Sequence, residues 1–372
     1  MSVIPSTVAR LPWKVMLLTT ALASFAGVVL YSAAGGSMSP WAGMHLVRFA
    51  LFMVMALVIA RFREDFIRDM AFPAYVGTLL LLLFVELLGQ VKGGSQRWIS
   101  LGAFNLQPSE LMKIAIVLAL ASFYSRLPAG ETSRFAAIWP ALVLIGLPCG
   151  LVLLQPDLGT TLAIAASGII VMFLAGLPLR YFIGGLAAVA AAVPVLFSFL
   201  HDYQQKRILI FLDPESDPLG AGYHISQSKI AIGSGGLFGK GFLNGTQSHL
   251  EYLPEGQTDF VFATMAEEWG LLGGLVLLTL FFLLLRWSTG VALSAKTKFG
   301  RYTAAGLTMT IFFYIAINLM MVMGLAPVVG IPLPFMSYGG SSMMTIMICV
   351  GIILAIERNG DRGRSGGLGG LA

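Results

Sequence analysis

Three charged residues stand inside or beside long apolar runs, where ionisable groups are costly and most often functional. Glu110 and Lys113 are three residues apart, which places them on one face of a helix. They form either a local ion pair or the charged wall of a cavity in which Lys113 meets a phosphate. Asp157 directly precedes an apolar run, where it either caps the next helix or coordinates a cation.

Asp259 lies at the start of another apolar run. A carboxylate at that boundary is partly desolvated, so its pKa can be tuned as a general base requires. The alternative interpretation is a helix cap. Glu267 and Glu268 lie further into the same run, and we expect at least one to face the interior, with structural pairing favoured over catalysis.

The segment 201–258 combines basic residues, prolines and glycines. Lys240 stands between Gly239 and Gly241, and glycine-rich backbone can approach a phosphate and offer N–H donors. The nucleotide-binding pattern GxxxxGK[ST] is absent from the sequence and no strand precedes Lys240, so the sequence does not favour an ATP-type loop. Because long structureless loops are rare, we expect short amphipathic helices here.

The elements that must position these residues follow from hydropathy. The 372 residues are 57% hydrophobic and only 11% charged, which indicates a chain that faces lipid. A span needs about 20 apolar residues. The sequence therefore predicts an all-α, polytopic membrane protein of about ten helices, at 15–34, 43–60, 72–89, 109–125, 136–154, 159–176, 180–200, 260–286, 303–323 and 342–357.

The basic residues predict the orientation. Fifteen of the 23 lysines and arginines fall on one side when the spans alternate, and that side is cytoplasmic by the positive-inside rule. Both termini are then inside. We expect one membrane domain over 1–372, a large extracytoplasmic loop at 201–258 between helices seven and eight, and a disordered cytoplasmic tail at 359–372. No block of like charges suggests nucleic-acid binding.

The combined motifs resemble the SEDS family (shape, elongation, division and sporulation) over about residues 10 to 357. The residues that carry the resemblance are Gln107-Pro108-Ser109-Glu110-Leu111-Met112-Lys113, Gln155-Pro156-Asp157-Leu158-Gly159-Thr160, Gly220-Ala221-Gly222-Tyr223-His224, Gln227-Ser228, Ala231-Ile232-Gly233-Ser234-Gly235-Gly236, Gly239-Lys240-Gly241, Leu253-Pro254-Glu255, Thr258-Asp259-Phe260 and Pro334-Phe335-Met336-Ser337-Tyr338-Gly339-Gly340-Ser341. The stretches 232–236 and 244–248 resemble elongation members more than division members. Gly256-Gln257 departs from many relatives, which carry a basic or histidine residue there.

The resemblance implies an inverting peptidoglycan glycosyltransferase in the bacterial cytoplasmic membrane, which polymerises lipid II into a growing glycan strand. It implies an essential aspartate at Asp259, polar cavity residues at Glu110, Lys113 and Asp157, and a divalent cation, Mg²⁺ or Mn²⁺, for which Asp259 and Asp157 are candidates. The implied partners are a class B penicillin-binding protein, other elongation proteins of the membrane, and membrane lipids. The substrate-binding candidates are Arg97, Trp98, Gln155, Arg207, Gln227, Lys240, Thr258, Ser337 and Ser341.

Two other functions remain open from the residues alone. Intramembrane charge and broken helices also mark transporters, so a lipid II flippase is one alternative. A noncatalytic scaffold of the elongation machinery is the other. The charged clusters gather at the predicted outer ends of the spans, which favours the enzyme over a path with access from both sides.

Overall fold

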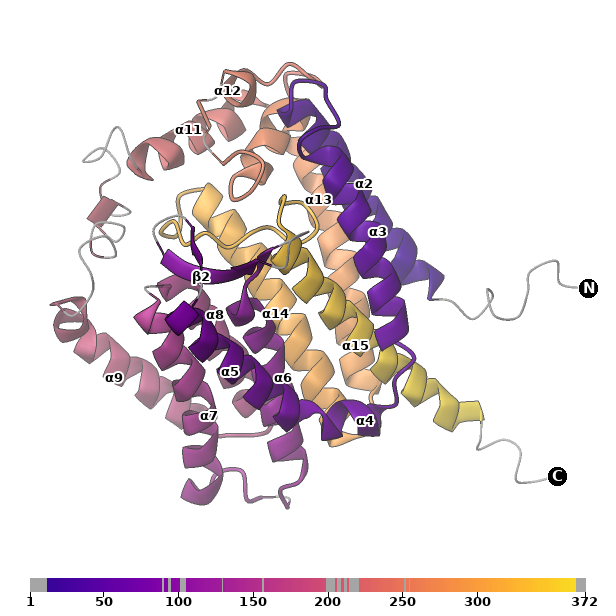
Figure 1. Cartoon of the computed structure of the whole chain (residues 1–372), viewed down its shortest axis with the longest axis vertical. Coiled ribbons are helices and arrows are strands. Elements are labelled where there is room, and N and C mark those ends of the chain that lie inside the picture. The colour runs from indigo at the N-terminus through magenta and orange to yellow at the C-terminus, as the bar shows by residue number, and fades with distance from the viewer. Residues whose placement is uncertain are drawn as a thin grey trace, which may run out of the picture.

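The computed structural model describes residues 12–365, except for 89, 93–94, 101–104, 129, 156, 199–204, 206–208, 211–212, 214–220, 251 and 254. Figure 1 shows a helical bundle with a small sheet and short helices at one end. The elements are α2 (Trp13–Ala33), α3 (Ala42–Ile59), α4 (Glu64–Asp69), α5 (Ala71–Leu88), β1 (Gln90–Lys92), β2 (Ser95–Ser100), β3 (Asn105–Leu106), α6 (Pro108–Ser125), α7 (Phe135–Leu154), α8 (Leu158–Leu174), α9 (Leu179–Ser198), α11 (Ala221–Ser234), α12 (Thr246–His249), α13 (Val261–Ser294), α14 (Lys298–Val322) and α15 (Gly340–Ser365).

The helices lie where the apolar runs predict them. Eight of those in the described part of the chain are long and apolar enough to cross a membrane, and α8 and the apolar part of α9 are shorter. The fold class is therefore confirmed as a helical membrane bundle, while a count of ten crossings stays a prediction. The helix α15 reaches Ser365, so it extends into the tail expected to be disordered, and 366–372 lie outside the described residues.

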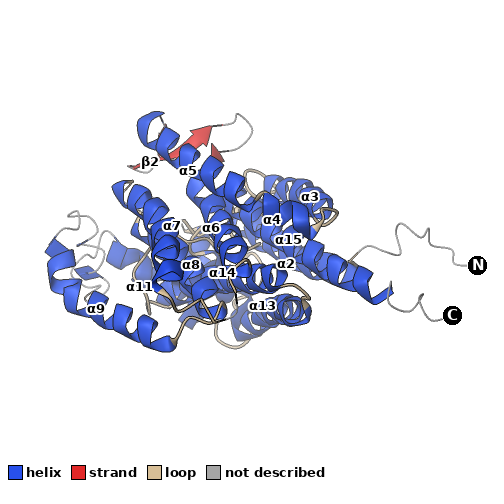
Figure 2. Cartoon of the chain, turned by 90° about the horizontal axis from the view of Figure 1, so that it is seen from below, coloured by secondary structure: helices blue, strands red, loops and turns tan. Residues whose placement is uncertain are grey.

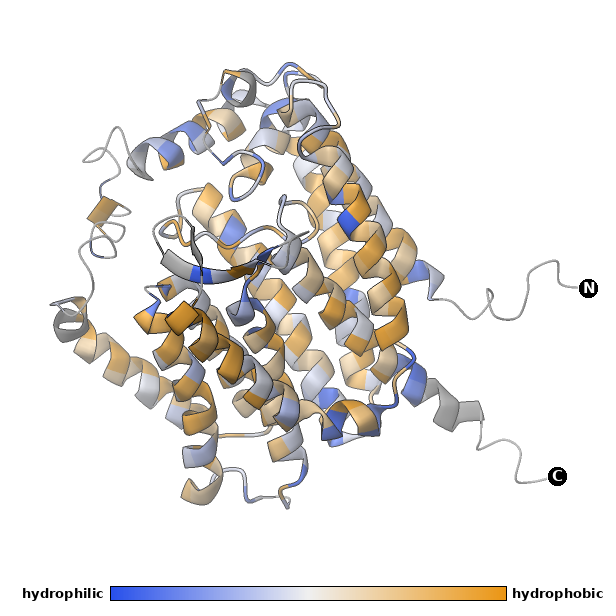
Figure 3. Ribbon diagram, in the orientation of Figure 1, coloured by the Kyte–Doolittle hydropathy of each residue, from blue (hydrophilic) through white to orange (hydrophobic). Residues whose placement is uncertain are grey.

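Helix α6 is the centre of the bundle. It contacts α5, α7, α8 and α14, and 83% of its apolar window is buried, against 28% for α3, α5 and α7. The outer helices present apolar side chains such as Leu51 and Leu87 to the surroundings (Figure 3). Small residues allow the close contacts inside: a Cβ at Gly306 of α14 would lie 2.7 Å from Val117 of α6 and 2.9 Å from Val171 of α8.

A three-stranded antiparallel sheet, in the order β1-β2-β3, lies at one end of the bundle beside α5 (Figures 1 and 2). Trp98 of β2 is opposite Gln90 of β1, and Ser100 is opposite Asn105 of β3. These strands were not predicted from the sequence. They are three, six and two residues long, which is too short for a clear alternating pattern.

Helix α13 is broken at Gly270, whose φ of 61° and ψ of −157° belong to a region that only glycine adopts readily. The break leaves backbone carbonyls without helical partners. The N–H of Lys240 donates to the carbonyl of Glu267 at 2.9 Å, and the N–H of Gly241 donates to that of Glu268 at 3.1 Å. The turn after α11 therefore caps the first part of α13.

The same turn also satisfies the second part of α13. The N–H groups of Leu271 and Leu272 donate to the carbonyls of Gly236 and Leu237 at 2.9 and 3.2 Å. A Cβ at Gly239 would lie 2.0 Å from the carbonyl oxygen of Glu268, so this approach requires glycine. The expectation that this glycine-rich backbone approaches a phosphate is therefore corrected: its polar groups are used inside the protein.

The two deeper carboxylates of α13 are structural, as expected. Glu267 is fully buried and accepts hydrogen bonds from Lys240 Nζ at 2.7 Å and from the N–H groups of Thr246 and Gln247 at 2.9 and 3.0 Å. The hydroxyl of Ser32 on α2 donates to the carboxylate of Glu268. Glu267 therefore holds the turn after α11, and Glu268 holds α2, against the break in α13 at Gly270.

The break in α13 gives a test of this capping. We expect Gly270→Ala to lower the free energy of unfolding by more than about 2 kcal/mol, because alanine is strained at this φ and ψ. Its Cβ would also lie 2.4 Å from the N atom of Gly239. The matched control is Gly146→Ala in α7, where a Cβ meets nothing within 4 Å. Thermal unfolding of both variants in detergent measures the difference, and equal midpoints would contradict the capping role.

Candidate functional site

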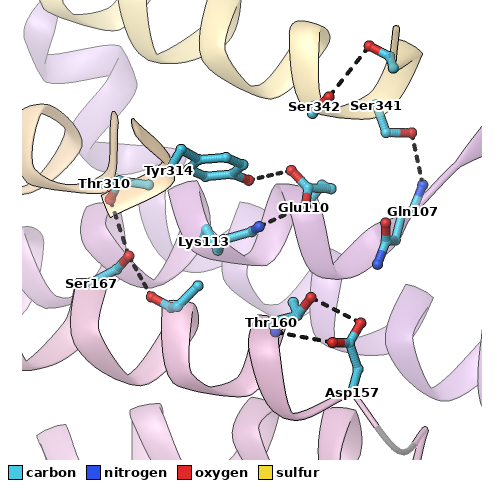
Figure 4. Close-up of polar contacts among 12 residues, drawn as sticks. Gln107, Glu110, Lys113, Asp157, Thr160, Ser167, Thr310, Tyr314, Ser341 and Ser342 are labelled. Carbon is cyan, nitrogen blue, oxygen red and sulfur yellow. Dashed lines mark hydrogen bonds and ion pairs between the residues drawn. The ribbon is translucent and has the colours of Figure 1, made fainter. Parts of the chain in front are cut away.

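Glu110 and Lys113 form a buried ion pair in the first two turns of α6. Lys113 Nζ lies 2.6 Å from Glu110 Oε1. The lysine side chain is 1% exposed and the glutamate side chain 6% exposed. The hydroxyl of Tyr314 on α14 donates to the other oxygen of Glu110. Lys113 Nζ also lies 4.2 Å above the centre of the Tyr314 ring (Figure 4).

The burial of this network has a free-energy cost that its internal contacts must offset. Burying two charges is costly unless they are paired and their remaining hydrogen-bonding groups are satisfied. Glu110 also stands in the first turn of a helix, where a negative charge is favourable. In this arrangement Lys113 is enclosed by Glu110 and Tyr314, so its ammonium is not open to a phosphate.

Asp157 caps α8 and also binds a strand of the sheet. Its carboxylate accepts from the N–H of Thr160 at 3.0 Å and from the Thr160 hydroxyl at 2.9 Å. Arg97 of β2 lies 3.1 Å from Asp157 Oδ2 and donates through Nε to the Gln155 carbonyl at 2.9 Å. The predicted cap is therefore present, and the structure brings Arg97, Gln155 and Asp157 together.

Asp259 lies half-buried just before α13, in a backbone held by α14. The Asn318 side-chain amide donates to the Asp259 carbonyl at 2.9 Å and to the Ile331 carbonyl at 2.8 Å. Asp259 Oδ2 lies 3.5 Å from the point that a Cβ at Gly330 would occupy. The carboxylate therefore lies against the loop that follows α14.

That loop joins the two aspartate regions. A Cβ at Gly159, in the first turn of α8, would lie 2.8 Å from Val329 Cβ and 2.9 Å from its carbonyl oxygen. Gly330, the next residue, lies beside Asp259. Residues 329 and 330 of this loop therefore border both Asp259 and the first turn of α8, the helix that Asp157 caps.

Ser337 fixes this loop to the turn that contains Asp259. Its hydroxyl donates to the Thr258 carbonyl at 2.6 Å and accepts from the N–H of Leu333 at 2.7 Å. The N–H of Tyr338 donates to the Gln257 carbonyl at 2.8 Å. The structure therefore brings the two candidates Ser337 and Thr258 together, and the serine hydroxyl binds backbone in this arrangement.

Ser341 makes the equivalent connection to the sheet. Its hydroxyl donates to the Asn105 carbonyl of β3 at 2.6 Å and accepts from the N–H of Gln107 at 3.2 Å. Gln107 is the residue before α6, and Glu110 follows it within the first turn of that helix (Figure 4). The start of α15 is therefore tied to the start of α6.

The other substrate-binding candidates are distributed differently. Trp98 is half-buried beside Arg97 on β2, and the Gln155 amide donates to the Leu82 carbonyl at 3.3 Å. Gln227 is half-buried on α11. Lys240 donates to Glu267 and to the Thr246 hydroxyl, both at 2.7 Å, so its charge is paired within the protein and its phosphate contact stays a prediction. Arg207 lies outside the described residues.

Three residues of this region were not among the predicted site residues. Tyr314 and Asn318 lie one helical turn apart on α14, and Arg48 of α3 lies 4.8 Å from the Tyr338 ring centre. No ion pair of Arg48 occurs within the described residues. Polar residues inside predicted spans were the available signal, because such residues are rare in lipid-facing helices.

A cation site at both aspartates does not fit the geometry. The Asp157 carboxylate already accepts three donors. Among the described residues, no group of three or more His, Cys, Asp and Glu side chains could hold a metal ion. Of the two predicted ligands, Asp157 and Asp259, only Asp259 remains a candidate. A single carboxylate can hold Mg²⁺ only together with water and substrate phosphates.

Comparison with known proteins gives consistent matches over almost the whole chain. The family described as cell cycle protein, with FtsW, RodA and SpoVE, matches residues 10–362. The peptidoglycan glycosyltransferase MrdB of Escherichia coli K12 is 46% identical over 346 residues, which cover 92% of each chain. Stage V sporulation protein E of Bacillus subtilis is 41% identical and covers 75% of this chain and 76% of its own.

Solved structures agree with the sequence matches. A chain from a peptidoglycan synthase complex, described as coordinating polymerization and crosslinking, has a TM-score of 0.81 and 32% identity over 94% of this chain and 98% of its own. The rod shape determining protein RodA of Thermus thermophilus has a TM-score of 0.71 and 29% identity, and covers 94% and 97%. The chain therefore belongs to the FtsW, RodA and SpoVE family, which is the SEDS family that its motifs resemble.

Proposed function

We propose that this chain is a peptidoglycan glycosyltransferase that polymerises lipid II during cell elongation. The observation that carries the proposal is the polar network at one end of an apolar bundle, where Asp259 is half-buried beside a fixed loop and near a buried ion pair. The relatives named peptidoglycan glycosyltransferase, and the matching chain of a peptidoglycan synthase complex, support it.

The chemistry is a single displacement. The 4-hydroxyl of the acceptor sugar attacks the anomeric carbon of the lipid-linked donor, the new C–O bond inverts that centre, and the lipid diphosphate leaves with the electron pair of the broken bond. Asp259 takes the hydroxyl proton as general base. Asn318 and Ser337 hold the backbone on both sides of Asp259, which fixes the position of its carboxylate.

The leaving diphosphate needs positive charge. Arg48 meets this need best, because it lies at the same end beside Tyr338 and Gly340 and forms no ion pair with a described residue. Arg97 is a second donor, although Asp157 already shares its charge. A divalent cation held by Asp259 together with the diphosphate would add Lewis-acid stabilisation. The polyprenyl chain would lie against the apolar outer surface of the bundle.

The partner that we propose is a class B penicillin-binding protein, together with other elongation proteins of the membrane. A matching chain comes from a complex that coordinates polymerization and crosslinking. Small residues on a lipid-facing helix permit close approach of a partner span. Gly184 and Gly185 of α9 are open, whereas Gly273 and Gly274 of α13 are buried, so α9 is the better surface.

The proposed location is the bacterial cytoplasmic membrane, with both termini and Lys296 inside and residue 244 outside. In a variant without Cys149 and Cys349, we expect Asn244→Cys to react with an impermeant maleimide in sealed right-side-out vesicles. Lys296→Cys, which is also exposed but lies on the other side, should react only after the vesicles are opened. The reverse pattern would contradict the orientation.

Asp259→Asn tests the catalytic assignment. The change keeps the shape of the side chain and removes its basicity, so we expect lipid II polymerisation to fall at least about 100-fold. The thermal midpoint should stay near that of the unchanged protein, because Asn318 and Ser337 contact the backbone here. A folded Asp259→Asn protein that polymerises lipid II at a near-normal rate would move the base to Glu110 or Asp157. Lipid II translocation without polymer would instead indicate a flippase, and neither activity a scaffold.

The Glu110–Lys113 pair can be tested for a role beyond structure. Lys113→Met leaves a buried carboxylate without its cation, which costs about 3–5 kcal/mol of stability. The double variant Glu110→Gln with Lys113→Met removes both charges and should recover most of that loss. We expect its polymerisation to stay at least tenfold below normal at the recovered stability. Full recovery of activity with stability would show that the pair is structural alone.

A further inference from the structure

The end of the molecule opposite the candidate site holds a cavity of about 450 Å³. It lies where α4, the end of α6 and the start of α14 meet, at the lower edge of Figure 1. It is lined by Arg68, Asp69, Ser125, Arg126, Thr297, Lys298 and Phe299. None of these residues takes part in the site described above, so the cavity needs a separate explanation.

The cavity is basic. Three of its lining side chains are cations and one is a carboxylate. Asp69 lies 3.9 Å from Arg68 Nε, and Arg68 also pairs with Asp65 at 3.1 Å. Arg126 and Lys298 are exposed and form no ion pair with any described residue. Two cationic charges therefore remain for an anion.

The start of α14 borders the same cavity and already holds one carboxylate, that of Glu64. Thr297 caps the helix by accepting from the Gly300 N–H at 2.8 Å, and its hydroxyl donates to Glu64. The first turn of α14, with Lys298 and Phe299, lines the cavity. Helix N-termini favour anions through their N–H groups and their dipole. Arg68 of α4, Arg126 at the end of α6 and Lys298 of α14 therefore converge on one cavity from three separate segments.

The surroundings indicate a lipid rather than a soluble ligand. The cavity is far larger than the roughly 30 Å³ that one water occupies, so it admits more than a lone phosphate. Phe66 and Met70, at either end of the same short helix segment as Arg68, expose 48% and 42% of their surface. In the proposed orientation this end lies in the cytoplasmic leaflet, where basic pockets between helices bind anionic headgroups.

We propose that this cavity binds the phosphodiester headgroup of an anionic phospholipid. Arg126 and Lys298 contact the phosphate, Arg68 completes the positive surroundings, and the acyl chains lie along the apolar side chains of α4, Phe66 and Met70. The site is independent of the glycosyltransferase chemistry. Its test therefore measures binding alone and stands whatever the outcome for Asp259.

The test uses the full chain in detergent, with short-chain phosphatidylglycerol as the probe and short-chain phosphatidylcholine and inorganic phosphate as comparisons. We expect phosphatidylglycerol to raise the thermal midpoint in a saturable way and the other two to have little effect. Each cation near an anionic headgroup contributes about fivefold in affinity. The double variant Arg126→Gln with Lys298→Gln should then bind phosphatidylglycerol about 25-fold more weakly.

The matched control is Arg61→Gln with Lys296→Gln. It removes the same charge from exposed residues of the same end that do not line the cavity. We expect its affinity for phosphatidylglycerol to stay within about twofold of normal. Equal losses in both double variants, or none in either, would overturn the site. Full stabilisation by inorganic phosphate at the same concentration would overturn the lipid as its ligand.

Discussion

Backbone polar groups inside a membrane must find partners within the protein, and this chain interrupts its helices where the candidate site lies. Asn318 satisfies two carbonyls at once, those of Asp259 and Ile331. Ser337 and Ser341 each accept one N–H and donate to one carbonyl. Irregular backbone is tolerated here because side chains of neighbouring helices replace the missing helical bonds. The same bonds hold Asp259 in place.

The buried ion pair adds a second constraint at the centre of the bundle. Glu110 and Lys113 lie on the most buried helix, and their charges are stable there only while Tyr314 and each other complete the network. A hydrophobic pair would fill that space at less cost. The retained charges indicate that the start of α6 is arranged for polar contact with its neighbours at this end, although Lys113 itself is enclosed.

Hydropathy predicted the helices well, because a run of about 20 apolar residues has few alternatives in lipid. The three-residue spacing of Glu110 and Lys113 also predicted that they lie together, because residues three apart are neighbours on one helix face. Tyr314 could not be assigned to them, because 204 residues separate it from Glu110 and only the packing of α14 on α6 joins the two. The first turn of α8, which Asp157 caps, and Asp259 meet the same loop for an equally nonlocal reason. The short strands carried too few residues for a pattern.

The glycine-rich turn shows how a sequence can predict hydrogen-bond donors correctly and still not predict the acceptor that they bind. A phosphate and the carbonyl end of a broken helix both accept hydrogen bonds from converging backbone N–H groups. Both therefore require a backbone that can approach closely. The sequence around Gly239 meets that demand, and the acceptors are the Glu267 and Glu268 carbonyls. Lys240 follows the same logic, because a cation between glycines suits any buried anion and Glu267 supplies one. The break at Gly270, 31 residues further on, decides between the two interpretations, and a single glycine within an apolar run gives little sign of it.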